Sequence, residues 1–294
     1  MRSLLFVPAD GGSKLDKAFT SGADAVIVDL EDSIAPDRKA EARVSAAAFL
    51  KQAGAQAKRP RLLVRVNGLA TGQTDADLDA IVPALPDAIL LPKAEGGASV
   101  IHADAKLAAC EAIAGVAEGR IKIVAQAVET AAGIFQLGSF RDAGARLIGM
   151  TWGPEDLSAE LGAETNRDAQ GQLTEPYRLA RSLCLFGAAA AETAAIETVY
   201  VDFRNLDGLR RDTEESRRDG FSGRLAIHPA QVPIINEVFT PSAAAIAKAK
   251  AIVAAFDGAP GAGVVGIDGV MYDRPHLMRA KLLLARAGEV TRPG

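Results

Sequence analysis

The stretch AVIVDLEDS, residues 25–33, joins an unbroken apolar run to three carboxylates. Its first four residues carry no polar side chain, which is typical of a strand that is buried on both faces. Such strands belong to parallel sheets that helices cover on both sides. Asp29, Glu31 and Asp32 follow directly. Because like charges this close repel each other, the acids predict either separate exposure to water or a cation beside them.

Seven further runs of this kind occur, and segments with helical spacing such as 37–54, 98–115 and 175–192 separate many of them. The eight runs are residues 4–8, 25–30, 62–67, 88–93, 121–129, 146–153, 198–203 and 224–229. Eight βα units in about 230 residues predict a TIM (β/α)8 barrel, an α/β fold with eight parallel strands inside a ring of helices. An open doubly wound sheet is the alternative, but its first turn usually carries G-x-G-x-x-G, and VPADGGSK lacks that pattern.

The pattern changes beyond the eighth strand. Residues 241–256 predict a helix and residues 276–288 a second, amphipathic one. The glycine-rich segment between them, 257–273, has no helical period, and we expect it not to fold on its own. The sequence therefore predicts a barrel domain over residues 1–240 and a C-terminal helical arm or lid over residues 241–294.

Composition excludes several classes of protein. The 294 residues contain 33 Lys and Arg against 37 Asp and Glu, so no basic surface for nucleic acid is expected. No uninterrupted apolar run of about 18 residues occurs, and Pro8 ends the first apolar stretch early, so we expect neither a membrane span nor a signal peptide. Cys110 and Cys184 offer neither a disulfide framework nor metal-ligand spacing, which favours a cytoplasmic location.

Nearly every predicted strand ends in a polar or ionisable residue. In TIM barrels these ends surround the active-site mouth. After Asp29, Glu31 and Asp32 come Arg65, Asn67, Lys93, Glu129, Asp156, Asp202 and His228. Acids that face one cavity need a cation, and oxygen ligands without a Cys or His cluster favour Mg²⁺, with Mn²⁺ also possible. We expect the three acids after the second strand to orient metal-bound waters, although Asp32 could instead begin the turn into the next helix.

Nine motifs occur in a fixed order, and they are distributed along essentially the whole chain, including the C-terminal arm. They are RSLLFVPA, SGADAVIVDLEDSIAPDRKAEAR, RVNG, LPKAE, VET, GPEDLSAELG, LAIHPAQV, INEVFTPS and DGVMYDRPHLMRAKLLL. In this combination the chain resembles the citrate lyase beta chain and malyl-CoA lyase family of the HpcH/HpaI superfamily. The resemblance implies a TIM barrel, a Mg²⁺ cofactor, a CoA-thioester substrate and a homotrimer or hexamer.

The resemblance also assigns roles to single residues. Glu129 of VET and Asp156 of GPEDL match the metal ligands, and Glu129 lies where the substrate binds. Arg65 of RVN matches a residue that binds the substrate's carbonyl or carboxylate oxygens. Asp273 of MYDRP matches a catalytic acid that the arm brings to a neighbouring subunit's site. His228 is the competing acid–base residue, because imidazole titrates near neutral pH.

Lys14 and Lys17 lie where this family places basic residues for the CoA phosphates. The chain departs from the family in the same loop, because it has Pro8-Ala9-Asp10 where P-G-N is usual. It also has Tyr272 where a small aliphatic residue is common. The first departure affects the expected nucleotide contacts, and the second affects the expected acyl pocket.

The expected activity is a reversible retro-Claisen cleavage of a 3-hydroxy-3-carboxyl acyl-CoA, such as malyl-CoA or citramalyl-CoA, to an acyl-CoA and a 2-oxo acid. Two alternatives stay open. One is a citrate lyase beta subunit that acts on citryl-ACP inside a complex. The other is a metal-dependent 2-oxo-acid aldolase that needs no CoA, although such an enzyme would make no use of the arm.

Overall fold

Eight parallel strands close into a barrel in the computed structural model, which describes residues 1–288. The strands are β1 (Ser3–Pro8), β2 (Ala25–Asp29), β3 (Arg61–Arg65), β4 (Ala88–Leu91), β5 (Lys122–Val128), β6 (Leu147–Trp152), β7 (Ala194–Glu197) and β8 (Gly223–Ala226). Strand β1 pairs with β2 on one side and with β8 on the other, which closes the ring. The TIM barrel is therefore confirmed, and the doubly wound sheet is excluded.

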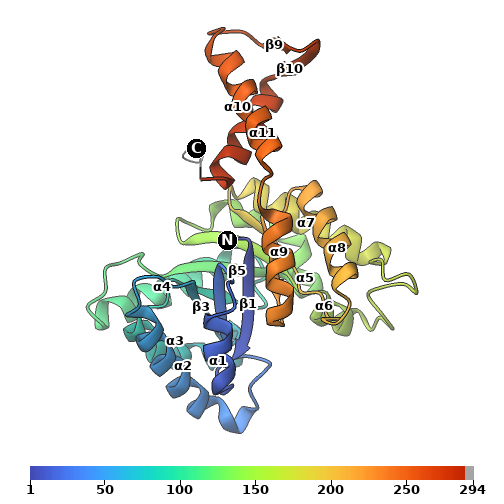
Figure 1. Ribbon diagram of the computed structural model, residues 1–294. Helices are drawn as coiled ribbons and strands as arrows, with labels where there is room; N and C mark the ends of the chain where they lie inside the picture. Colours follow the sequence, from blue (N-terminus) through green and yellow to red (C-terminus); the bar gives the residue numbers. More distant parts are fainter. Residues whose placement is uncertain (289–294) are drawn as a thin grey trace. The chain divides into compact units, whose positions relative to one another are not determined.

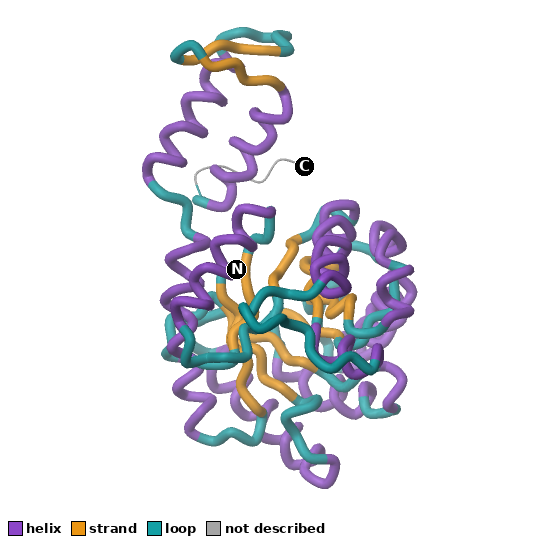
Figure 2. Tube along the Cα trace, turned by 90° about the vertical axis from the view of Figure 1, so that its right-hand side faces the viewer, coloured by secondary structure: helices purple, strands orange, loops and turns teal. Residues whose placement is uncertain are grey.

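Helices surround the barrel as an outer layer (Figures 1 and 2). They are α1 (Ser13–Phe19), α2 (Lys39–Gly54), α3 (Thr74–Ile81), α4 (Gly97–Ile113), α5 (Ala131–Phe135), α6 (Pro154–Leu161), α7 (Glu175–Ala190), α8 (Leu206–Asp219) and α9 (Val232–Phe239). Both faces of each strand are therefore covered, which is why the strands read as continuous apolar runs.

Aliphatic side chains fill the barrel interior. The central cluster is Leu4, Ala25, Ile27, Leu63, Ala88, Leu90, Val124, Ile196 and Leu225. Because side chains alternate between the faces of a strand, the next inward position on β2 after Ile27 is Asp29, and the next on β3 after Leu63 is Arg65. The interior thus changes from apolar to charged where the strands reach the mouth.

The seventh strand lies earlier than the sequence predicted. Strand β7 is Ala194–Glu197, whereas the predicted run 198–203 forms the loop that follows it. Two of the four residues of this strand are alanines, which have low β propensity. The loop after it contains β-branched and aromatic residues, whose high β propensity led to the wrong prediction. Asp202 consequently lies in that loop, where its carbonyl accepts from the Asn205 N–H at 3.0 Å, and does not end a strand.

The chain divides into two compact units, Met1–Asn236 and the residues from Glu237 onward. The second unit contains α10 (Ala243–Asp257), the antiparallel strands β9 (Val264–Ile267) and β10 (Val270–Asp273), and α11 (Arg274–Arg286). Residues 264–273 of the glycine-rich segment form an antiparallel hairpin, which packs with residues of α10 and α11.

The hairpin has a local cause in its sequence. Asp268 and Gly269 form its turn with φ values of 49° and 77°, the left-handed conformations that a two-residue Asp-Gly turn requires. Buried Val265 and Tyr272 face each other across the two strands and pack in one cluster with Phe256 of α10 and other residues of the unit. The hairpin therefore buries its apolar face within the second unit.

One stretch, Pro229–Asp257, is long and apolar enough to cross a membrane by length and composition alone. The structure interrupts it at residues 240–242, so it forms the two separate helices α9 and α10. Neither helix reaches the length of about 20 residues that a membrane span needs. The absence of a membrane span stays a prediction.

Candidate active site

Asp29 and Arg65 are register partners on β2 and β3 at the barrel mouth. Arg65 donates from Nε to Asp29 Oδ1 and from Nη2 to Oδ2, each at 2.7 Å. The guanidinium carbon also lies 4.9 Å from the centre of the Phe6 ring. Burial alone would raise the pKa of the Asp29 carboxyl, but the hydrogen bonds and positive charge of Arg65 hold that pKa below its usual value.

Glu31 lies between two cations. Its Oε2 is 2.9 Å from Arg65 Nη1, and its Oε1 accepts from Lys93 Nζ at 2.7 Å. Asp32 is more exposed and lies 3.8 Å from Lys93 Nζ and 4.0 Å from Arg65 Nη1. The three acids at the end of β2 thus have cations beside them, and these are the side chains of Arg65 on β3 and of Lys93 in the turn after β4. The expected role of the acids in orienting metal-bound waters stays a prediction.

Glu129 follows β5 directly and is 1% exposed. Its Oε2 accepts from the Lys93 backbone N–H at 2.6 Å, and its Oε1 accepts from Gln126 Nε2 at 2.5 Å. Burial, reinforced by the negative charges of Asp156 and Glu31, raises the pKa of Glu129 to about 8. A cation bound beside a carboxyl in this setting would favour its ionised form and lower its pKa.

Asp156 lies in the first turn of α6, which begins at Pro154. Its Oδ1 lies 3.3 Å from Lys93 Nζ. The adjacent Glu155 instead accepts from Asn166 Nδ2 at 3.0 Å, so the two neighbouring acids have different partners. The assignment of Asp156 as a metal ligand stays a prediction.

Gly153 leaves space for the side chain of Glu129. A Cβ atom at position 153 would lie 2.9 Å from Glu129 Cγ and 3.0 Å from Gln126 Nε2. Contacts this short are not tolerated, so any larger residue would displace the carboxylate. The absence of a side chain at this position, immediately before α6, is therefore part of the geometry of the site.

The donor set fits a divalent oxygen-seeking cation. Glu129 and Asp156 offer carboxylate oxygens, and Gln126 Oε1 is buried without a hydrogen-bond partner in the described chain. Within residues 1–288, no cluster of three or more His, Cys, Asp or Glu side chains is placed to hold a metal. Mg²⁺ commonly binds through one or two carboxylates and keeps several waters, so two protein ligands suffice for it.

The two lysines expected to bind CoA phosphates, Lys14 and Lys17, are exposed on α1, directly after β1. The acid in the preceding loop, Asp10, lies 3.8 Å from Arg38 Nη2, so its charge is partly offset. His228 has a structural partner, because its Nδ1 accepts from the Ala230 N–H at 3.2 Å and its ring stacks on Phe203. These contacts give His228 a role in the turn after β8.

Asp273 belongs to the second unit and is the N-cap of α11. Its carboxylate accepts from the His276 N–H at 3.3 Å and contacts the His276 ring nitrogen Nδ1. The hydrogen bond from His276 lowers the pKa of Asp273, so the group is a carboxylate near neutral pH. Its predicted catalytic part stays a prediction.

The sequence reasoning gave no role to Lys93 or Gln126. Lys93 was expected only as a strand end, yet its side chain contacts acids after β2 and in α6, and its backbone N–H donates to Glu129 after β5. Gln126 is the single polar residue of the run IVAQAV and is 6% exposed. A lone amide in an apolar strand is the signal that could have identified it, because buried polar groups need partners.

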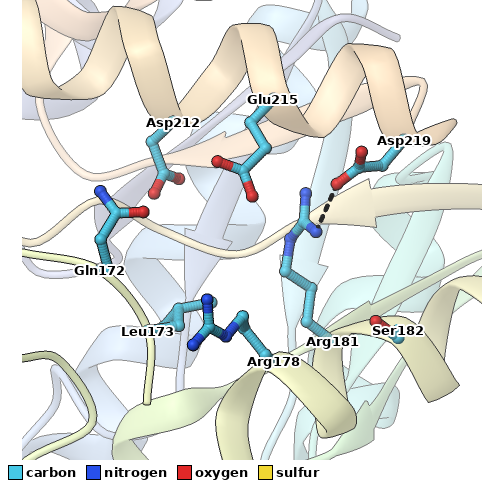
Figure 3. Close-up of a pocket in the computed structure, with 8 residues that line it drawn as sticks. All are labelled: Gln172, Leu173, Arg178, Arg181, Ser182, Asp212, Glu215 and Asp219. Carbon is cyan, nitrogen blue, oxygen red and sulfur yellow. Dashed lines mark hydrogen bonds and ion pairs between the residues drawn. The ribbon is translucent and has the colours of Figure 1, made fainter. Parts of the chain in front are cut away.

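A separate cavity of about 190 Å³ lies between α7 and α8 (Figure 3). Its lining residues are Gln172, Leu173, Arg178, Arg181, Ser182, Asp212, Glu215 and Asp219. The acids and bases there largely pair with their neighbours, as Arg181 does with Asp219 at 2.8 Å. None of the site residues expected from the sequence lines this cavity.

Comparison with known proteins agrees with the geometry. Residues 2–229 match the HpcH/HpaI aldolase/citrate lyase family. The chain is 37% identical over 288 residues to a (3S)-malyl-CoA thioesterase of Cereibacter sphaeroides, covering 97% of this chain and 94% of the relative. It is 34% identical over 287 residues to a citrate lyase subunit beta-like protein of Mycobacterium tuberculosis, covering 98% and 96%.

A solved structure of similar fold is the protein CitE of Mycobacterium tuberculosis in complex with magnesium, acetoacetate and coenzyme A. It is 31% identical in sequence with a TM-score of 0.77, over 98% of this chain and 100% of that chain. The match extends along the whole chain, and the family model spans every strand of the barrel. The chain therefore belongs to the HpcH/HpaI aldolase/citrate lyase family.

Proposed function

We propose that the protein is a Mg²⁺-dependent lyase that cleaves the C–C bond of a 3-hydroxy-3-carboxyl acyl-CoA thioester, or forms it in reverse. The observation that carries the proposal is the pairing of buried Glu129 with Asp156 at one mouth, beside the fixed guanidinium of Arg65. The comparisons support the same proposal. Two relatives are named as a malyl-CoA thioesterase and a citrate lyase subunit beta-like protein, and a similar structure contains magnesium and coenzyme A.

Glu129 and Asp156 would hold the metal ion, with waters completing its shell. When bound, Mg²⁺ supplies Lewis-acid polarisation of the substrate's hydroxyl and carboxylate oxygens. The backbone N–H of Lys93 and the amide of Gln126 fix the Glu129 carboxylate from two sides, so the ligand is oriented in advance.

Arg65 would stabilise the charge that develops during cleavage. As the C2–C3 bond breaks, the hydroxyl proton passes to water, C3 becomes the carbonyl carbon of the 2-oxo acid, and the electron pair of the broken bond forms the thioester enolate. The Nε and Nη2 atoms of Arg65 donate to Asp29, and Nη1 lies 2.9 Å from Glu31 Oε2, so a substrate oxygen would approach Arg65 at Nη1 and share it with Glu31. A guanidinium fixed in this way provides charge stabilisation with little reorganisation.

The enolate must then take up a proton at C2. We assign this step to Asp273, which would take up a proton from water and pass it to C2, and in the condensation direction its carboxylate would remove the same proton. The lowered pKa of Asp273 suits the second role directly. The assignment places the second unit of one chain at the barrel of a neighbouring chain in a homotrimer or hexamer, which is part of the proposal.

Thioester hydrolysis is a second candidate, because a relative 37% identical to this chain is named as a (3S)-malyl-CoA thioesterase. The two reactions give different products from malyl-CoA. Cleavage yields acetyl-CoA and glyoxylate, whereas hydrolysis yields malate and free CoA thiol.

One assay separates these activities. Malyl-CoA, citramalyl-CoA and citryl-ACP are each incubated with enzyme and Mg²⁺, while 2-oxo acid is trapped as a hydrazone and free thiol is measured with a disulfide reagent. We expect 2-oxo acid without stoichiometric thiol from a CoA substrate, and no product with EDTA or with Glu129→Gln. Thiol release without 2-oxo acid would establish hydrolysis, and turnover of the carrier-protein substrate alone would establish a citrate lyase subunit.

A further inference from the structure

Lys93 contacts both of the residues to which we assign the metal. Its backbone N–H donates to Glu129 Oε2 at 2.6 Å, and its side-chain Nζ lies 3.3 Å from Asp156 Oδ1. The side chain also donates to Glu31 Oε1 at 2.7 Å. One residue thus connects the carboxylates that follow β2, β5 and β6.

The backbone of Lys93 is held in an uncommon conformation. Its φ is +50°, in the left-handed region that residues other than glycine rarely occupy. Such a conformation persists where the surrounding contacts fix it, and here the N–H donates to Glu129. The ammonium reaches the acids of β2 and α6 from the same residue, so both contacts depend on this turn.

Negative side chains outnumber positive ones around the metal site that we propose at the barrel mouth. Five acids, Asp29, Glu31, Asp32, Glu129 and Asp156, converge there. Arg65 is occupied by Asp29 and Glu31, so within the described chain Lys93 is the base that forms an ion pair with Asp156. Without a metal ion, the Lys93 ammonium is the positive charge that offsets the repulsion around Asp156.

We propose that Lys93 is the built-in counter-cation of the metal site. Its ammonium neutralises Glu31 and Asp156 in the metal-free protein, and it releases Asp156 Oδ1 when a divalent ion binds. Lys93 thereby keeps the mouth assembled without metal and weakens the affinity for metal. The proposal rests on the proposed function, because it takes Glu129 and Asp156 as the metal ligands.

The side chain has the properties that such an exchange needs. It is 37% exposed, and a lysine stem is flexible, so the ammonium can leave one acid without disturbing the backbone. After leaving Asp156 it retains Glu31 at 2.7 Å and has Asp32 within 3.8 Å. The backbone hydrogen bond to Glu129 does not depend on the side chain.

Lys93→Met isolates the ammonium, because methionine keeps a long unbranched side chain and any non-glycine residue bears the same backbone strain. Mn²⁺ is titrated into the substrate-free protein, and free Mn²⁺ is measured by electron paramagnetic resonance. We expect Lys93→Met to bind Mn²⁺ at least about 10-fold more tightly, since a positive charge within a few ångströms of the ion is removed. Lys93→Arg should stay close to wild type.

Thermal unfolding in EDTA supplies the second readout. Lys93→Met should melt below wild type without metal, and the difference should shrink in saturating Mn²⁺, which supplies the missing charge. Lys106→Met is the matched control, because it removes an ammonium that pairs with Asp75 at 2.5 Å on the helical layer. It should leave Mn²⁺ affinity unchanged.

Mn²⁺ binding to Lys93→Met that is no tighter than wild type would overturn the proposal, as would equal melting temperatures in EDTA. Failure of the proposed function looks different. If Glu129→Gln binds Mn²⁺ as well as wild type does, Glu129 is not a metal ligand. The proposal that Lys93 releases Asp156 to a metal ion at this site is then overturned as well. The melting comparison in EDTA then decides whether Lys93 stabilises the mouth.

Discussion

Arg65 donates two parallel hydrogen bonds to Asp29 across neighbouring strands, each at 2.7 Å. This pair fixes the orientation of the guanidinium before any substrate arrives. It also explains why β2 can end in a carboxylate that is 2% exposed, because the buried charge has both of its oxygens satisfied. The site therefore depends on a forked donor that lysine cannot imitate.

Arg65→Lys should lower kcat/KM by about 100-fold or more, since a single ammonium cannot hold Asp29 and stabilise a substrate oxygen together. Arg59→Lys is the matched control. Arg59 makes a similar fork to Asp87, at 2.5 and 3.1 Å, before β3. Arg59→Lys should lower the melting temperature and leave kcat/KM near the wild-type value. Equal losses of activity in Arg65→Lys and Arg59→Lys would show that Arg65 acts only through the stability of the fold.

The pH dependence of stability follows from the pKa of Asp29, which the fold holds below its ordinary value of 3.8. A lowered carboxyl pKa stabilises the fold above the unfolded-state pKa, and this contribution is lost as pH falls through the folded-state pKa. Urea unfolding of wild type and Asp29→Asn should thus differ by a constant amount above about pH 5. The difference should shrink as pH falls below about 4, and a difference at pH 3 as large as that at pH 6 would contradict the assignment.

The barrel was predictable because its signal is repetitive. Runs apolar on both faces recur eight times, and their carboxyl ends carry the charged residues, so Asp29, Arg65, Lys93 and Glu129 were all expected at one mouth. Strand β7 was misplaced because packing between β6 and β8 decides its position, while its own residues, AAIE, have weak β propensity.

The pairing of charges was not predictable from the sequence. Strand-end position does not say that Lys93 faces Glu31 and Asp156, because that depends on a left-handed backbone turn at residue 93. The contact of Gln126 with Glu129 likewise depends on an irregular register between β5 and β6 and on the missing side chain at Gly153. The contacts of Lys93 also join segments that lie far apart in the sequence, 62 residues in the case of Glu31.

Gly153→Ala should weaken Mn²⁺ binding by about 10-fold or more, because the new methyl group would overlap Glu129 Cγ and push the carboxylate from its two donors. Gly138→Ala is the control, because a Cβ at position 138 meets no atom within 4 Å. Mn²⁺ titration of both variants checks the prediction, and unchanged affinity in Gly153→Ala would remove Glu129 from the metal site.

The part played by Asp273 can be separated from its role as a helix cap. Asparagine caps helices about as well as aspartate, so Asp273→Asn should keep α11 and lose only the negative charge. Asp273→Ala loses the cap as well, and so should destabilise α11. If Asp273 transfers the proton at C2, both variants should lose most of their turnover while Mn²⁺ affinity stays unchanged, and the melting temperature should fall in Asp273→Ala alone.

Mixing subunits then tests whether Asp273 serves a neighbouring barrel. Asp273→Asn and Glu129→Gln are each expected to be inactive, and neither substitution creates a large cavity. If the second unit acts across subunits, exchange of the two variants should restore part of the activity, because some sites would combine an intact Glu129 from one chain with an intact Asp273 from another. Confirmed subunit exchange without recovered turnover would assign Asp273 to its own barrel or leave it only as the cap of α11.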